Sequence, residues 1–452
     1  MSTGSKNYGF QHACRDALAK LGRYYNEEDP MDVDLIPLAD AVLPLIRTNR
    51  RDLWRYSASN EQGSRMIDGA SLLEVAVDSP ATLPDLGIQV PTPKETYAVA
   101  HKALASAIRV IGRADDSAGI IGSACRQLIR LHPLAAAAAA VPQVKLADWV
   151  YKFHFDEAVD YFNLDPVAYA PALGDKGIAR LRELVAGLHL EIATTPGANP
   201  QYSYDHREFL AQWFDQRFAV LDRDLEAIIA THLHDAKVAA RYEDVAKAFE
   251  EIGEVDLAIS WAHQAMLFDR GHQARTAAGR WWQLLESHRP QELPGAARLI
   301  FDRWPNAEAA ARLVTLTGDD LVDYVLAALA KIPDDLIRFQ LDTLDDPKLA
   351  WRTAQDIEGL SNGTWDKLAQ AYFVIDPLAA LEIQLKLIDA TLTEANTRRY
   401  RPAALELKKL RQAAIKVSPE AGALVDQGIR DLRETYNRRP SFLAALDRAK
   451  LP

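Results

Sequence analysis

The sequence predicts an all-α protein, with an N-terminal helical region over residues 1–195 and an α-solenoid of tetratricopeptide-like helical hairpins over residues 205–452. Three observations support this prediction. Strand signals are scarce, because sustained alternation of β-branched residues is almost absent. Alanine, leucine, glutamate, arginine and aspartate dominate long stretches in which apolar residues recur with the period of an α-helix. Hairpins of one kind then recur in the second half.

Length and charge limit the kinds of protein this chain can be. Its 452 residues exceed one ordinary domain, which favours a large core or an elongated array of repeated units. It carries 52 Lys and Arg against 63 Asp and Glu, for a net charge of -11. Because an acidic surface repels the phosphate backbone of nucleic acids, binding to DNA or RNA would need a local basic patch.

The first residues contain no apolar signal-peptide core, and no run of about 18 apolar residues follows them. We therefore expect a cytoplasmic protein that does not enter a membrane. Only two cysteines occur, Cys14 and Cys125, which are too few for a disulfide framework and fit a reducing compartment. Neither lies in the signature of a catalytic cysteine, so we interpret both as inert thiols.

Three stretches rich in proline and glycine interrupt the helical pattern, near residues 79–95, 193–203 and 286–297. Proline removes a backbone donor and glycine frees the dihedral angle φ, so helices end in such stretches. The middle stretch is the best candidate for a boundary between two halves. Beyond it, apolar residues recur at spacings of three and four, which predicts one amphipathic helix over residues 205–235.

The second half contains segments with the spacing of tetratricopeptide-like hairpins. In residues 242–265, small residues fall where two helices would touch, large residues fall between them, and Gly253 supplies the turn. Residues 365–387 repeat the pattern with a turn at Asp376 and the proline after it, and a weaker match turns at Asp346. Stacked hairpins of this kind form a solenoid, whose repeats bury their cores between neighbours.

The most tempting functional segment runs from Leu146 to Gly174, where aromatic rings and carboxylates surround His154. A calcium loop starting at Asp156 would need a central glycine and a closing glutamate, and this segment has neither. A zinc site on a helix would need a second histidine within a turn, which is also missing. We therefore interpret the rings as anchors of a helix and the following loop, and predict no metal site.

Other histidines and the common catalytic motifs give no site either. His232 and His234 stand two apart, on opposite sides of a helix, and a glycine separates His263 from His272. The sequence has no P-loop, no G-x-G-x-x-G after a strand and no G-x-S-x-G elbow, so it lacks the usual phosphate cradles and hydrolase nucleophile. We predict a protein that is not an enzyme and binds no cofactor.

Two clusters combine arginines with an aromatic residue, a pairing that nucleic acids use. They surround Trp54 and Tyr400, and their arginines are Arg47, Arg50, Arg51 and Arg55 in the first and Arg398, Arg399 and Arg401 in the second. Given the acidic net charge, we interpret both mainly as solvated faces paired with carboxylates, and keep nucleic-acid contact as the alternative.

Trp281 and Trp282 form the other candidate surface. Adjacent residues stand about 100° apart on a helix, so one ring can face the core and the other a groove that receives a partner. Burial of both rings in the core is the competing interpretation, because tryptophan is usually mostly buried.

The C-terminal half resembles an uncharacterised bacterial helical-repeat family, whose members occur alone or downstream of a SWIM zinc finger. The matching segments are the hairpins at residues 242–266 and 364–389, the arginine-rich helix start at 396–411 and the ending at 432–451. The resemblance implies a tetratricopeptide-like helical-repeat fold over residues 205–452. A SWIM finger holds zinc with spaced cysteines and a histidine, and two isolated cysteines cannot form one. No nucleic-acid role of the finger therefore carries over to this chain.

The sequence thus combines abundant repeats and surface charge with no recognisable chemistry. Because a solenoid leaves an extended face open to a partner, we expect a scaffold or adaptor that binds another protein. Residues 419–452 have the apolar side chains of a cap for the last hairpin, and an uncovered end of the array would allow self-association. The alternative function is binding of DNA or RNA through the arginine clusters.

Overall fold

The computed structural model describes residues 35–155, 162–194, 206–234 and 236–452. Over these residues the chain consists of α-helices joined by turns and short 3-10 helices, with no β-strand and one isolated parallel bridge between Ile36 and Ile88. The predicted all-α class is confirmed. None of the described helices combines the length and the apolar character that crossing a membrane requires.

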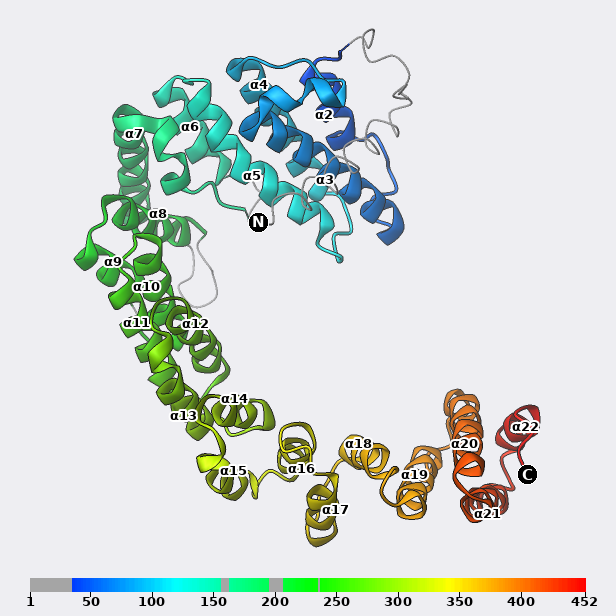
Figure 1. Cartoon of the computed structure of the whole chain (residues 1–452). Helices are drawn as coiled ribbons and strands as arrows, with labels where there is room; N and C mark the ends of the chain where they lie inside the picture. Colours follow the sequence, from blue (N-terminus) through cyan, green and yellow to red (C-terminus); the bar gives the residue numbers. More distant parts are fainter. Residues whose placement is uncertain (1–34, 156–161, 195–205, 235) are drawn as a thin grey trace. The chain divides into compact units, whose positions relative to one another are not determined.

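The chain divides into two compact units. Figure 1 labels the helices of both in chain order. Unit 1 comprises Met1–Ala236 and Lys247–Glu254, and unit 2 comprises Lys237–Ala246 and Val255–Pro452. The helices of unit 1 are α2 (Leu38–Ile46), α3 (Tyr56–Asp78), α4 (Pro93–Ile111), α5 (Ile120–Ala138), α6 (Gln143–Phe153), α7 (Pro166–Thr194), α8 (His206–Asp222) and α9 (Leu225–His232). The next helix, α10 (Ala239–Glu251), contributes to both units.

The helical array was predicted to begin at residue 205, after a boundary near residues 193–203. Most of that boundary lies outside the described residues. Helices α8 and α9, which follow it, group with unit 1, and α8 packs against α7.

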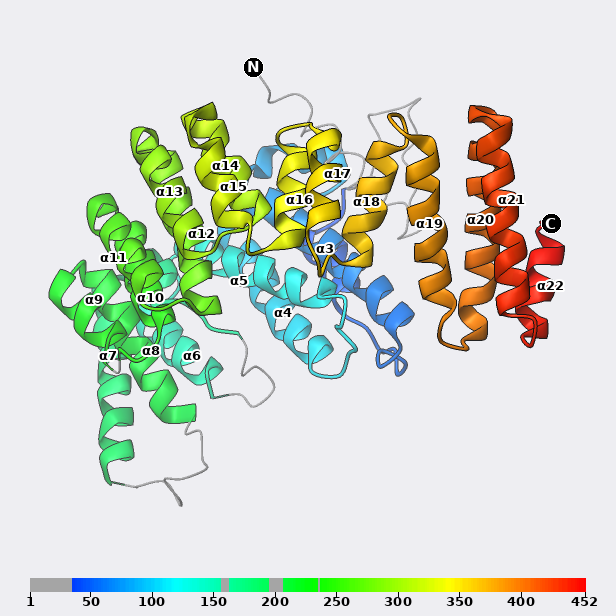
Figure 2. The same cartoon turned by 90° about the horizontal axis from the view of Figure 1, so that it is seen from below.

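Unit 2 is a succession of helices (Figure 2). They are α11 (Val255–Leu267), α12 (His272–His288), α13 (Leu293–Arg303), α14 (Ala307–Thr317), α15 (Val322–Leu329), α16 (Pro333–Asp342), α17 (Pro347–Asp356), α18 (Asn362–Tyr372), α19 (Pro377–Leu392), α20 (Thr397–Val417), α21 (Pro419–Thr435) and α22 (Pro440–Arg448). Most helices contact the next one along the chain. Contacts also join α14 to α16, α16 to α18, α19 to α21 and α20 to α22.

Several helices of unit 2 begin with a side chain that caps the first turn. Asp346, Ser361, Asp376 and Ser418 each accept a hydrogen bond from the backbone N–H three residues later, at the starts of α17, α18, α19 and α21. A proline follows the cap in three of these helices, where its missing N–H would have had no helical partner. The turns predicted at Asp346 and Asp376 therefore lie between helices, as expected from the sequence.

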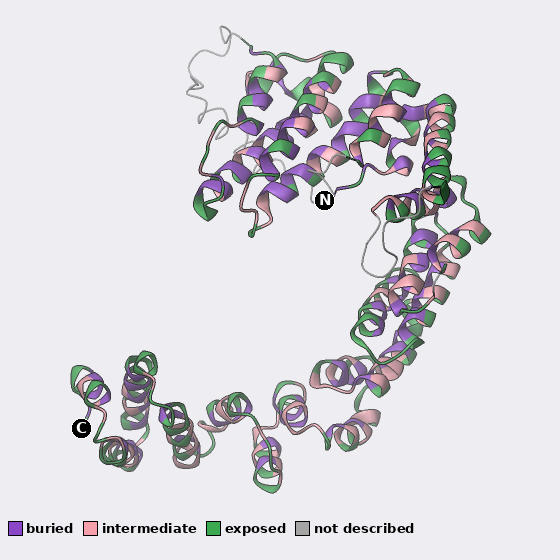
Figure 3. Cartoon of the chain, turned by 180° about the vertical axis from the view of Figure 1, so that it is seen from behind, coloured by how far each residue is buried: buried purple, intermediate pink, exposed green. Residues whose placement is uncertain are grey.

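The apolar interior of unit 2 is divided among neighbouring helices. One cluster centres on Phe301 and Phe339, and another joins residues of α19 to α22. In the second cluster Ile429 of α21 and Phe442 of α22 are fully buried. Figure 3 shows the same pattern, with buried residues on the helix faces that contact other helices.

Unit 1 has a larger continuous core, to which residues from α2 to α8 contribute, and within it α3 packs against both α2 and α5. Two glycines of α3 permit these close approaches. A Cβ atom at Gly63 would lie 2.8 Å from Cγ2 of Ile120, and one at Gly69 would lie 2.9 Å from Cδ1 of Ile46. Both distances are shorter than a carbon–carbon contact allows, so any larger residue would separate the helices.

The prediction of one helix over residues 205–235 is wrong, because the chain breaks between α8 and α9. Arg223 adopts a left-handed backbone conformation with φ of 55°. Asp224 then caps a new helix, since its carboxylate accepts a hydrogen bond from the N–H of Ala227 at 3.0 Å. Apolar residues continue at helical spacing across the break, so periodicity alone missed the competing aspartate cap.

Candidate functional site

The segment Leu146–Gly174 forms α6, a turn and the start of α7, and its residues 156–161 lie outside the described part. His154 is only 5% exposed. Its Nε2 atom lies 3.4 Å from the backbone nitrogen of Leu164, and its ring packs against Trp213 and Phe214 of α8. Burial lowers the pKa of His154 to about 4, so this imidazole is neutral at physiological pH.

The other histidines also make protein contacts. Nδ1 of His232 lies 2.8 Å from the backbone oxygen of Ile228. The ring of His263 lies 4.6 Å from that of Trp281. Among the described residues no group of three or more His, Cys, Asp and Glu side chains is placed to hold a metal ion.

Of the two cysteines, Cys14 lies outside the described residues. Cys125 is buried, and burial raises the pKa of its thiol to about 12. A thiol that stays protonated at neutral pH is a poor nucleophile, so Cys125 acts as a small apolar core residue.

Sequence reasoning missed a buried chain of polar side chains in unit 1. His132 of α5 is fully buried between His101 of α4 and Tyr169 of α7, and its two ring nitrogens lie 3.1 and 2.8 Å from their polar atoms. Trp149 of α6 stacks on His132 with the ring centroids 4.6 Å apart. The only local sequence signal for this chain of polar groups is the position of His132 on the apolar face of a helix. Its partners are distant in sequence, so no local pattern reveals them.

The arginine cluster around Trp54 separates into different environments. Arg50 is ion-paired with Asp52 at 3.1 Å and with Glu61 at 2.6 Å. Arg51 is exposed, and the guanidinium of Arg55 lies 5.0 Å from the centroid of the Trp54 ring, which is 66% exposed. The fourth member, Arg47, lines a pocket together with Arg109 of α4 and Arg113, which follows that helix.

The cluster around Tyr400 lies at the start of α20. The Tyr400 ring is buried against Phe442, so its faces are not open to a nucleic-acid base. Arg398 and Arg401 are exposed, and Arg399 lies 3.7 Å from a carboxylate oxygen of Glu394.

Trp281 and Trp282 differ in burial, as adjacent residues of a packed helix should. Trp281 is buried against His263. Trp282 is half-buried beside the apolar cluster of α13 to α16, and the guanidinium of Arg312 lies 4.6 Å from its ring centroid. Arg312 therefore covers part of the ring that would otherwise meet a partner.

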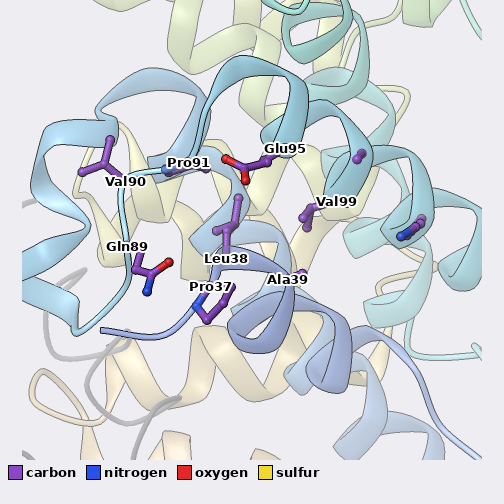
Figure 4. Close-up of a pocket in the computed structure, with 10 residues that line it drawn as sticks. Pro37, Leu38, Ala39, Gln89, Val90, Pro91, Glu95 and Val99 are labelled. Atoms are coloured by element: carbon purple, nitrogen blue, oxygen red, sulfur yellow. The ribbon is translucent and has the colours of Figure 1, made fainter. Parts of the chain in front are cut away.

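A small pocket of unit 1 is lined mainly by apolar side chains (Figure 4). Its volume is about 180 Å³. The labelled carboxylate, Glu95, accepts hydrogen bonds from the backbone N–H and the hydroxyl of Thr92 at 2.7 and 2.9 Å. Because Glu95 completes the N-terminal cap of α4, we assign its carboxylate a structural role in this pocket.

A groove of unit 2 combines apolar, polar and charged side chains from three consecutive helices. Its volume is about 390 Å³. The lining residues are Asp366 and Gln370 of α18, Phe373 directly after it, Gln384 and Ile388 of α19, and Glu406, Lys409, Leu410 and Ala413 of α20. Among these, Ile388 and Leu410 are buried and form an apolar floor.

The groove carries more acid than base and one unsatisfied acceptor. Partial burial raises the pKa of Glu406, the charge of Asp366 raises it further, and Lys409 acts in the opposite direction. Oε1 of Gln384 is buried and has no hydrogen-bond partner in the described part of the chain. A buried amide oxygen without a partner loses the hydrogen bonds that water would give it, so a ligand N–H donor would stabilise it.

The described geometry of this groove therefore offers a surface suited to binding. Its features are an apolar floor, an acceptor and excess negative charge, all presented by neighbouring helices. No protein-family model and no curated protein matches this chain.

Proposed function

We propose that this protein is a non-enzymatic scaffold or adaptor that holds a segment of a partner protein in the groove across α18, α19 and α20. The observation that carries the proposal is the combination of an apolar floor with the buried Gln384 oxygen, which has no hydrogen-bond partner among the described residues. Apolar area gives affinity, and a few placed polar groups fix the orientation of the bound chain.

The arrangement of unit 2 supports an α-solenoid of tetratricopeptide-like hairpins. Helices contact both the next helix and, repeatedly, the one after it, and the apolar clusters are local. In solenoids such packing leaves one helix of each pair free to line a binding surface. We also propose a cytoplasmic location for this scaffold. Cys125, the one cysteine in the described residues, is a buried free thiol, which fits a reducing compartment.

The chemistry of the groove defines the partner. An apolar side chain would cover Ile388 and Leu410, and a lysine or arginine would neutralise the excess charge of Asp366 and Glu406. A backbone N–H of the same segment would donate to Oε1 of Gln384. The partner segment is therefore extended, and it carries basic and apolar residues close together.

A displayed library of random peptides tests this proposal. Wild-type protein should enrich peptides that combine an apolar residue with a basic one. Glu406→Lys should weaken the selected peptides about tenfold or more, because it replaces an attractive charge with a repulsive one. Glu382→Lys is the matched control, since Glu382 is an exposed residue of α19 outside the groove lining. Equal weakening by both variants would contradict the groove as the binding site.

Direct binding of DNA or RNA is the second candidate function. The exposed Trp54, with the Arg55 guanidinium beside its ring and Arg51 nearby in the chain, favours it. Aromatic rings stack on bases while arginines contact phosphates, and such binding weakens steeply with salt. Trp54→Ala together with Arg51→Gln should abolish binding to a single-stranded oligonucleotide. If wild-type protein does not bind the oligonucleotide at low ionic strength, this candidate is removed.

A further inference from the structure

A second pocket, in unit 1, brings together three arginines from two separate segments. Its volume is about 520 Å³. The lining residues are Arg47, Thr48 and Asn49 from the loop after α2, and Ser106, Arg109, Val110 and Arg113 from α4 and the residues after it. None of them takes part in the groove of unit 2, so the two sites are independent.

Ser106 fixes two of the guanidinium groups. Its hydroxyl oxygen accepts from Nε of Arg47 at 3.4 Å and from Nη2 of Arg109 at 3.3 Å, and the hydroxyl donates to the backbone oxygen of Lys102 at 2.6 Å. Ser106 is only 3% exposed, so its position is set by packing. Because both donor nitrogens contact this one oxygen, the guanidinium groups of Arg47 and Arg109 lie close together.

Among the described residues, the three arginines of this pocket have no carboxylate partner. Arg113 donates from Nη2 to the backbone oxygen of Thr48 at 2.5 Å, which is again a neutral acceptor. Within the described ranges, none of the three arginines forms an ion pair, whereas Arg50 of the same loop pairs with two carboxylates. Like charges held close together repel one another, and an anion bound between them would relieve that repulsion.

We propose that this pocket binds the phosphate group of a small phosphorylated molecule, either a phosphate monoester or a diphosphate. The planar guanidinium donates paired N–H groups that match phosphate oxygens. A phosphate monoester carries a charge of about -1.5 to -2 at neutral pH, which suits a group of arginines. The Thr48 hydroxyl accepts from the N–H of Arg50 at 3.2 Å. Its own O–H donates to no residue of the described ranges, so it is available to the ligand.

The arrangement favours a small ligand over a polynucleotide. Arg47, Arg109 and Arg113 converge on one pocket instead of following a line along the surface. The adjacent Arg50 is neutralised by its ion pairs, and the net charge of -11 repels a long polyanion. This site therefore adds small-anion binding in unit 1 to the protein binding proposed for unit 2.

Calorimetric titration of the full chain with pyrophosphate, at constant ionic strength set with sodium chloride, tests the proposal. We expect saturable binding at one site per chain. Arg109→Gln and Arg47→Gln should each weaken it about tenfold or more, because each removes a charge-assisted hydrogen bond. Arg51→Gln, which removes an exposed arginine of the same loop outside the pocket, should leave the affinity unchanged.

Ser106→Ala separates a built pocket from a diffuse positive surface. It keeps every charge but removes the oxygen that positions Arg47 and Arg109, so pyrophosphate should bind more weakly while the circular dichroism stays helical. The proposal is overturned if pyrophosphate shows no saturable binding, or if Arg51→Gln weakens it as much as Arg109→Gln does. It is also overturned if a single-stranded oligonucleotide binds and pyrophosphate does not.

Discussion

The phenol oxygen of Tyr169 lies 2.8 Å from Nδ1 of His132, and both side chains are buried. Nε2 of His132 lies 3.1 Å from Nδ1 of His101. Because the Tyr169 hydroxyl has no other acceptor among the described residues, it donates to His132, which in turn donates from Nε2 to His101. One directed chain of hydrogen bonds thus joins α7, α5 and α4.

Tyr169→Phe should lower the free energy of unfolding by about 1 to 3 kcal/mol. The substitution leaves a buried ring nitrogen of His132 without its partner, and an unsatisfied buried polar atom costs about that much. Urea unfolding followed by circular dichroism measures the change.

Tyr97→Phe is the matched control for this prediction. The Tyr97 ring also packs on His132, with the centroids 5.2 Å apart, but the side chain is only half-buried. Its hydroxyl makes no hydrogen bond with a described residue, so the substitution should change the free energy of unfolding by less than about 0.5 kcal/mol. Equal losses from the two variants would show that the rings matter and the hydrogen bond does not.

The protein should lose stability as the pH falls from about 6.5 toward about 4. Burial lowers the pKa of His132 to about 3, with a further lowering from His101, and burial lowers that of His154 to about 4. An unfolded histidine has a pKa of about 6.5, so below that pH the unfolded chain binds more protons than the folded one. Each histidine then removes up to about 1.4 kcal/mol per pH unit.

Urea midpoints at about pH 7, 6 and 5, at constant ionic strength, measure this loss; carboxylates titrate mostly below that window. NMR of the histidine side chains tests whether this loss of stability comes from His132 and His154, because both rings should remain neutral in the folded protein at about pH 5. A ring that becomes charged near pH 6 would contradict the prediction for that residue.

Local features of the fold were predictable from the sequence, whereas contacts between residues far apart in the sequence were not. The caps at Asp346 and Asp376 follow from an aspartate and a proline side by side, a rule that operates within one turn. The break at Arg223 was missed because the Asp224 cap competes with an unbroken apolar period. The pocket of Arg47 and Arg109 depends on how α2 packs against α4, and no local pattern encodes that packing.

The same contrast applies to the candidate groove. Its lining comes from α18, α19 and α20, so the hairpin pattern predicted the helices but did not single out Gln384 or Glu406. Their importance depends on burial and on a neighbouring carboxylate, which are properties of the packed unit. Tyr400 illustrates the opposite error: its sequence neighbours are arginines, but packing places its ring in the core.

Gly253→Ala and Gly279→Ala should have opposite effects on stability. Gly253 joins α10 to α11 with φ of 81°, a conformation that a residue with a Cβ atom adopts at a cost of about 1 to 2 kcal/mol. Gly279 is an exposed residue within α12, and nothing lies within 4 Å of its potential Cβ. Alanine there should stabilise by up to about 1 kcal/mol, because it restricts the unfolded chain and favours the helix. Urea midpoints that shift in the same direction for both variants would refute the conformational argument.

Arg217→Gln should destabilise unit 1 more than removal of any surface arginine does. The Arg217 guanidinium forms paired hydrogen bonds with Asp165, at 2.8 and 2.7 Å, and with Glu251, at 2.9 and 2.6 Å. Its side chain is only 15% exposed, while the two carboxylates are more open to water. We therefore expect Arg217→Gln to lower the free energy of unfolding by about 2 kcal/mol, which lies between the values for an exposed and a buried ion pair.

Arg130→Gln is the control for that substitution. Arg130 pairs with Glu74 on the surface of the same unit, and its side chain is 55% exposed, so its loss should cost less than about 1 kcal/mol. Salt should distinguish the two variants further, because screening weakens an exposed pair more than a partly buried one. The difference in urea midpoint between wild type and Arg217→Gln should therefore persist at high ionic strength. If it disappears there, Arg217 acts as an ordinary surface charge and does not hold α7, α8 and the end of α10 together.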